Sequence, residues 1–233
     1  MADSNTYIFL DFETGSKNKY NTQPTQLAAV AIDKRTGEIL PDSEFSSYIK
    51  PIFDEEECKK KGVAVIEDKA LKITKITIEQ LKEAPPLKDV WNNFCGYVNR
   101  YNPSKSQWSA PIMAGFNINN FDKEIIRRIA GVKPYNFGPF DKEYQECTLF
   151  HPFKRWDIME DVQKWMESNR DMRSISMDSL REYFSMSKDN AHNAIIDVKQ
   201  GAAILGKFLK LYRHYLQYTE FKDCFKGHPE FGG

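Results

Sequence analysis

The sequence lacks the features that mark several large classes of protein. Its longest uninterrupted apolar run, Leu27 to Ile32, is too short to cross a bilayer. Its first residues, MADSNTYIFL, lack the cationic stretch of a signal peptide. The 33 Lys and Arg residues balance 33 Asp and Glu residues, so no net charge draws the chain onto nucleic acid or a membrane. These absences predict a soluble protein with no membrane partner.

Cysteines are few and scattered. None of the four belongs to a CxxC pair; they are Cys58, Cys95, Cys147 and Cys224. We therefore expect reduced thiols and a cytoplasmic location.

The length and apolar content favour one domain. A chain of 233 residues, 41% of them apolar, can bury a sizeable core without disulfides or a structural metal. It contains no internal repeat, low-complexity block or Gly/Ser linker that would divide it. We expect a single domain over residues 1–218 and an irregular C-terminal tail over 219–233.

The hydrophobic pattern alternates strands with helices, which predicts an α/β domain. The predicted strands are Tyr7–Asp11, Gln26–Asp33, Glu44–Lys50 and Pro111–Phe116, with Cys147–Phe150 as a candidate final strand. The predicted helices run from an N-cap at Thr77 to Ala84, over Leu87–Tyr101, from an N-cap at Asn120 to Ala130, and over Trp156–Glu167, Met177–Phe184 and Asn193–Tyr218. The first three strands form a meander, and the stretch Asp54–Thr77 shows no clear periodicity.

Two acids end the first predicted strand. Asp11 and Glu13 project from one face because side chains alternate along a strand, and Phe12 points the other way. Two carboxylates beside a buried strand repel each other unless a cation lies between them, and a hard divalent ion suits oxygen ligands. The Asp-x-Glu pattern recurs elsewhere, so a solvated strand end stays open as an alternative for this pair.

Two further elements carry acids at the starts of helices. Asp122 closes the motif GFNINNFD, where a buried strand leads into a helix, although an acid there is also favoured by the helix dipole. His192 and Asp197 open the long C-terminal helix at five-residue spacing. They converge on one site only if His192 lies on the preceding loop; an exposed capping histidine is the alternative interpretation.

The ordered set of an acid pair on the first strand, an acid after a later strand and His-x4-Asp on a C-terminal helix resembles the DEDDh family of 3'-to-5' exonucleases. Bacterial polymerase proofreading subunits represent this family. The resemblance covers about residues 5 to 212 and includes the intervening segment LKITKITIEQLKEAPPLKDVWNNFCGYV. It implies a ribonuclease H-like fold, with a mixed five-stranded sheet flanked by helices.

The resemblance also implies a division of roles in two-metal hydrolysis. Four carboxylates balance the charge of two Mg²⁺ ions, for which Mn²⁺ can substitute. Asp11 bridges both ions, Glu13 and Asp197 complete the water-activating site, and Asp122 serves the second ion through water. His192 is the implied general base, because an imidazole titrates near neutrality.

Two positions implied to bind substrate depart from the family pattern. Thr14, expected to contact the 3'-terminal sugar, is followed by Gly15-Ser16 rather than by Thr-Gly. Asn117 stands where many members carry His. In this respect the motif GFNINNFD is more similar to the matching motif of family B polymerase exonuclease domains. Those domains use a Tyr four residues before the last Asp, whereas this chain has Asn193 there and His192 one residue earlier, which favours the His subtype.

The expected partner is the single-stranded 3' end of DNA or RNA, with a polymerase as a further candidate. Arg127, Arg128 and Lys133 are candidates for holding the upstream backbone, although a solvated face is the commoner role. DNA is the favoured substrate of the expected metal-dependent 3'-to-5' exonuclease. The alternatives are an exoribonuclease that trims RNA or degrades oligoribonucleotides, and a catalytically idle module that binds nucleic acid or a polymerase.

Overall fold

The structure is a computed structural model that describes residues 4–143, 146–168, 172, 174–187 and 193–218. Its strands are β1 (Thr6–Thr14), β2 (Pro24–Asp33), β3 (Phe45–Tyr48), β4 (Ile112–Gly115) and β5 (Arg155–Asp157). Its helices are α1 (Glu55–Lys61), α2 (Asp68–Thr74), α3 (Ile78–Glu83), α4 (Leu87–Asn99), α5 (Asp122–Ala130), α6 (Ile158–Ser168), α7 (Met177–Tyr183) and α8 (Ala194–Tyr218).

The five strands form one mixed sheet in the order β3-β2-β1-β4-β5. The meander β1-β2-β3 is antiparallel, whereas β4 and β5 run parallel to β1. β1 is therefore central and buried between two neighbours, as its apolar run predicts. The predicted α/β class and five-stranded ribonuclease H-like sheet are confirmed.

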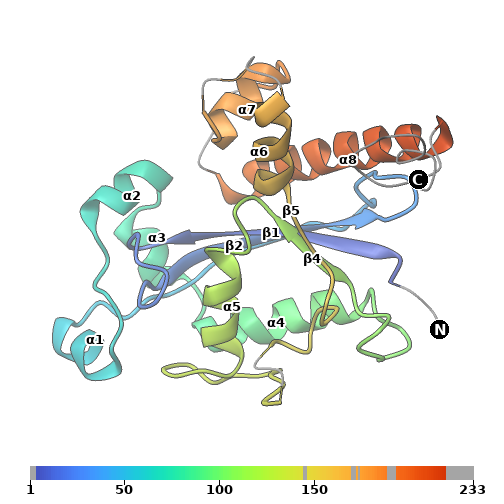
Figure 1. Ribbon diagram of the computed structural model, residues 1–233. Coiled ribbons are helices and arrows are strands. Elements are labelled where there is room, and N and C mark those ends of the chain that lie inside the picture. The colour runs from blue at the N-terminus through green and yellow to red at the C-terminus, as the bar shows by residue number, and fades with distance from the viewer. Residues whose placement is uncertain (1–3, 144–145, 169–171, 173, 188–192, 219–233) are drawn as a thin grey trace, which may run out of the picture.

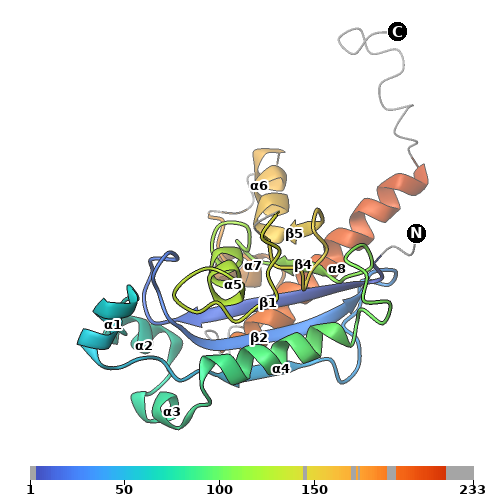
Figure 2. The same cartoon turned by 90° about the horizontal axis from the view of Figure 1, so that it is seen from below.

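Helices cover both faces of this sheet, and Figures 1 and 2 show α4 and α5 on one side with α6, α7 and α8 on the other. On the first side, Ile8, Leu10 and Phe12 pack with apolar residues of α4 and α5. On the second, Tyr7 and Phe9 pack with those of α6, α7 and α8. Strand alternation thus places Asp11 and Glu13 on the face that α8 covers.

Local capping explains some element boundaries and corrects others. Thr77 caps α3 through a full capping box with Gln80, as predicted. The expected cap at Asn120 is wrong, because Phe121 precedes α5 and no side chain caps the helix. The side-chain amide of Asn120 donates instead to Asn117 Oδ1 at 3.2 Å.

The predicted last strand, Cys147–Phe150, is wrong. That segment lies in turns, and the fifth strand is Arg155–Asp157, which pairs with Met113–Gly115 of β4. The following helix consequently begins at Ile158 rather than at Trp156. Two short helices, α1 and α2, occupy the stretch that showed no periodicity. The predicted tail over 219–233 lies outside the described residues, and the single-domain boundary stays a prediction.

None of the described helices combines the length and apolar character needed to cross a membrane.

Helix α8 approaches the sheet closely at Gly201. A Cβ added there would lie 2.4 Å from Cζ of Phe9, which is buried in the core. Gly201→Ala should lower the free energy of unfolding by about 1–3 kcal/mol through overpacking. Gly96→Ala on α4 is the matched control, because nothing lies within 4 Å of its added Cβ, and it should raise stability by about 0.5–1 kcal/mol. Urea denaturation measures both; equal effects would contradict this packing.

Candidate active site

The acids predicted from three separate segments gather around the end of β1. The pairing of β1 with β4 ends at Phe9, and β1 continues beyond it. In this extension the N–H of Phe12 donates to Asp122 Oδ1 at 3.0 Å. Asp122 is buried, at 2% exposure. The helix start and the strand end are thereby joined across 110 residues of sequence.

Asp11, Glu13 and Asp197 form the other part of the group. Asp11 and Glu13 are partly buried on the face that α8 covers, and Asp197 lies in the first turn of α8. The negative charge of Asp197 acts on both strand acids, raising the pKa of each. Asp197 also forms an ion pair with Arg181, with 2.5 Å between Oδ1 and Nη2.

The electrostatics of the group are those of like charges held together in a poorly solvated place. Burial, followed by the charge of Asp197, raises the pKa of Asp11 to about 7. Burial, followed by the charges of Asp11 and Asp197, raises the pKa of Glu13 to about 8. The pKa of Asp122 is raised well above its ordinary value, by burial first and by Asp11 second. Carboxyls perturbed in this way are typical of functional sites.

A divalent cation suits this donor set, because it supplies the positive charge that the clustered carboxylates need and prefers oxygen ligands. Among the described residues, no three acid, imidazole or thiol groups converge tightly enough to form a finished metal site. The carboxylates are therefore chemically suited to a divalent cation, but their oxygen atoms do not converge on one point in this structure.

Asp157 holds the turn that delivers Asp122. This buried acid ends β5 and accepts the N–H groups of Asn117 at 2.8 Å and Asn119 at 3.0 Å. Asn117 has a φ of 59°, a left-handed conformation that asparagine tolerates. Burial raises the pKa of Asp157, and the three backbone donors that include Met159 oppose the rise. Sequence reasoning missed Asp157, although it lies at a junction between a strand and a helix, as Asp122 does.

A cavity of about 360 Å³ lies beside Glu13 and Thr14. Its other walls combine apolar, hydroxyl and charged side chains, namely Ser16, Lys17, Glu67, Lys69, Ala70, Ile73, Thr74 and Phe121. Of the two residues predicted to bind substrate, Thr14 lines this cavity, whereas Asn117 is absent from its lining within the described part of the chain. The α2 wall was not predicted, because its seven residues carry too short a pattern.

Gly15, one of the departures from the family pattern, lets the α2 wall of this cavity approach the end of β1. A Cβ at Gly15 would lie 2.2 Å from Cδ1 of Ile66. The carbonyl of Gly15 accepts the N–H of Glu67 at 2.8 Å, immediately before α2. The absence of a side chain at this position therefore brings α2 against the end of β1.

Two further predictions concern single residues and have different outcomes. The predicted general base, His192, lies outside the described residues. Arg128 is wrong as a backbone-gripping residue, because it is buried and donates to the carbonyls of Lys19 at 2.8 Å and Thr22 at 2.9 Å.

Comparison with known proteins gives a family and a fold. The family model RNase_T, described as an exonuclease, matches residues 8–205. Escherichia coli exonuclease I in complex with a dT13 oligonucleotide is 18% identical, with a TM-score of 0.61, over 92% of this chain and 43% of that one. The zinc-bound E. coli exonuclease I–ssDNA complex is 21% identical, with a TM-score of 0.65, over 93% and 43%.

A third structure, cell-death related nuclease 4, is 16% identical, with a TM-score of 0.59, over 89% of this chain and 64% of that one. The chain thus spans less than half of the exonuclease I chains just compared. No curated protein sequence matches it at a significant level.

The raised pKa values give the metal-free protein a defined pH dependence. Between pH 5 and 8 the folded state holds protons on Asp11 and Glu13 that the unfolded state has released, so stability falls as pH rises. Melting temperature measured in EDTA should therefore fall across this range, and Asp11→Asn should reduce the slope. Stabilisation by Mn²⁺ should grow with pH, because its ligands must lose their protons. A melting temperature that rises with pH in EDTA would contradict the assignment.

Proposed function

The chain belongs to the exonuclease family whose model covers residues 8–205, and on that premise we propose a metal-dependent 3'-to-5' exonuclease that releases nucleoside monophosphates, preferably from DNA. The supporting observation is the convergence of Asp122 on β1 beside Asp11 and Glu13, with Asp197 acting on both strand acids. Carboxylates from three distant segments have no structural need to share one place. Hydrolysis of a phosphodiester by two cations requires such a set.

In this proposal the protein divides the work among its acids. Asp11 with Glu13 and Asp197 would hold one Mg²⁺ or Mn²⁺, and Asp11 with Asp122 would hold a second. When bound, these ions supply charge stabilisation for the phosphate and lower the pKa of the attacking water. His192 would remove the proton from that water, which requires it neutral before the step. The carboxylates would hold the ions in place and balance their charge.

The neighbouring cavity suits the terminal nucleotide of a single strand. Its volume lies within the range of small-molecule sites. Phe121 and Ile73 offer apolar surface on which a base can stack, while Lys17 and Lys69 can attract phosphates. Thr14 lines this cavity next to Glu13, where it would contact the terminal sugar. A chain of zero net charge thus needs only a local grip on its substrate.

The deciding experiment is degradation of 5'-labelled and 3'-labelled single strands of DNA and RNA with Mg²⁺ or Mn²⁺. The wild-type protein should shorten 5'-labelled strands stepwise and release the 3' label at once. Asp11→Asn should lower the rate at least about 100-fold, since even outer partners of metal ligands are worth 10–100-fold. Asp42→Asn is the matched control, because Asp42 is exposed and precedes Glu44 in the same Asp-x-Glu spacing; it should leave the rate unchanged.

Other results would redirect the proposal. Shortening that survives unchanged in Asp11→Asn would contradict the assigned acids. Faster degradation of RNA than of DNA would identify the trimming exoribonuclease instead. Binding of oligonucleotides without any cleavage, in either metal, would identify the idle module.

A further inference from the structure

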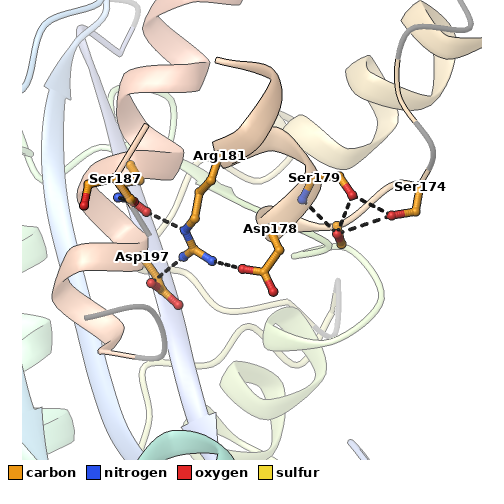
Figure 3. A network of polar contacts seen from close by, with 8 residues as sticks. Ser174, Asp178, Ser179, Arg181, Ser187 and Asp197 are labelled. Atoms are coloured by element: carbon orange, nitrogen blue, oxygen red, sulfur yellow. Dashed lines mark hydrogen bonds and ion pairs between the residues drawn. The ribbon is translucent and has the colours of Figure 1, made fainter. Parts of the chain in front are cut away.

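A buried guanidinium lies against the acid group from the side of α7. Arg181 is 1% exposed and uses all three of its nitrogens. Nη2 contacts Asp197 Oδ1 at 2.5 Å, Nη1 contacts Asp178 Oδ1 at 2.6 Å, and Nε donates to Gln200 Oε1 at 2.6 Å (Figure 3). Burial of a charge costs several kcal/mol unless partners compensate. The arrangement therefore demands both a neighbouring acid and a fixed geometry.

The two carboxylates on this guanidinium are not equivalent. The side chain of Asp178 is 61% exposed and lies three residues earlier on the same helix, so solvent weakens that pair. The side chain of Asp197 is 16% exposed and belongs to another helix. The contact with Asp197 is consequently the less screened of the two, and it joins α7 to the start of α8.

The guanidinium is itself held in one orientation. Gln200, which accepts from Nε, donates its own amide to the carbonyl of Ser187 at 2.8 Å. A planar guanidinium fixed at three nitrogens restrains a carboxylate more strongly than a point charge does. Asp197 is therefore constrained through Arg181 and not through its own helix alone.

Arg181 also interacts electrostatically with Asp11, in addition to its contact with Asp197. Arg181 is thus electrostatically part of the acid group, although it belongs to an element that carries none of the predicted site residues.

We propose that Arg181 is a positioning residue that fixes the Asp197 carboxylate of α8 toward Asp11 and Glu13, so that the acids receive their cations in one arrangement. This inference rests on the proposed function. Hydrogen-bonding partners behind metal ligands are typically worth 10–100-fold in metal affinity or activity. A purely structural clip between α7 and α8 would change stability without changing cation affinity.

The test compares Arg181→Met and Arg181→Lys with wild type in the full chain. Calorimetry with Mn²⁺ alone should show one binding event weakened about 10–100-fold in Arg181→Met and less in Arg181→Lys, which keeps the charge but loses the planar geometry. On a single-stranded oligonucleotide, kcat should fall while KM stays within about twofold. Arg181→Lys keeps the test valid if Arg181→Met does not fold.

Arg213→Met is the matched control. Arg213 attaches the other end of α8 to the carbonyls of Lys34 and Arg35, so its loss should lower melting temperature and leave Mn²⁺ affinity unchanged. Wild-type or tighter Mn²⁺ affinity in both Arg181 variants would overturn the positioning role, whatever their melting temperatures. Absence of Mn²⁺ binding and of cleavage in the wild-type protein would instead overturn the proposed function, and this inference with it.

Discussion

Repulsion among carboxylates from three separate elements is the interaction on which the rest of the arrangement depends. Asp11 and Glu13 on β1 face Asp197 on α8, and Asp122 on α5 is bound to the backbone of the same strand. Like charges in a poorly solvated place favour either protonation or the arrival of cations. The raised pKa values of Asp11 and Glu13 correspond to protonation. The guanidinium of Arg181, paired with Asp197, supplies part of the positive charge that bound cations would complete.

The fold maintains this unfavourable group by rigidity on every side. β1 is paired with β2 over its whole length and lies in the centre of the sheet. α8 reaches the sheet through Gly201, the turn before α5 is bound by Asp157, and α2 reaches β1 through Gly15. Core burial therefore opposes the repulsion, and the acids lie in place before substrate arrives. Acids held in this way would position the cations that stabilise developing charge.

The sequence was sufficient for the parts of the structure that rest on local patterns. The apolar run before Asp11 identified the central strand, and acids placed after strands identified Asp122. β5 was missed because three residues, Arg155–Asp157, carry no periodicity and become a strand through pairing with β4. Arg181 was missed because an arginine on a short helix is usually solvated, and its burial depends on the docking of α8. Contacts between distant segments decide both, and no local pattern encodes them.

X-ray diffraction from crystals grown with Mn²⁺, recorded to locate anomalous scatterers, tests the central claim most directly. The account predicts two Mn²⁺ ions about 4 Å apart, with Asp11 between them, Glu13 and Asp197 on one and Asp122 on the side of the other. Scatterers found only elsewhere on the molecule, with the four acids still apart, would contradict it.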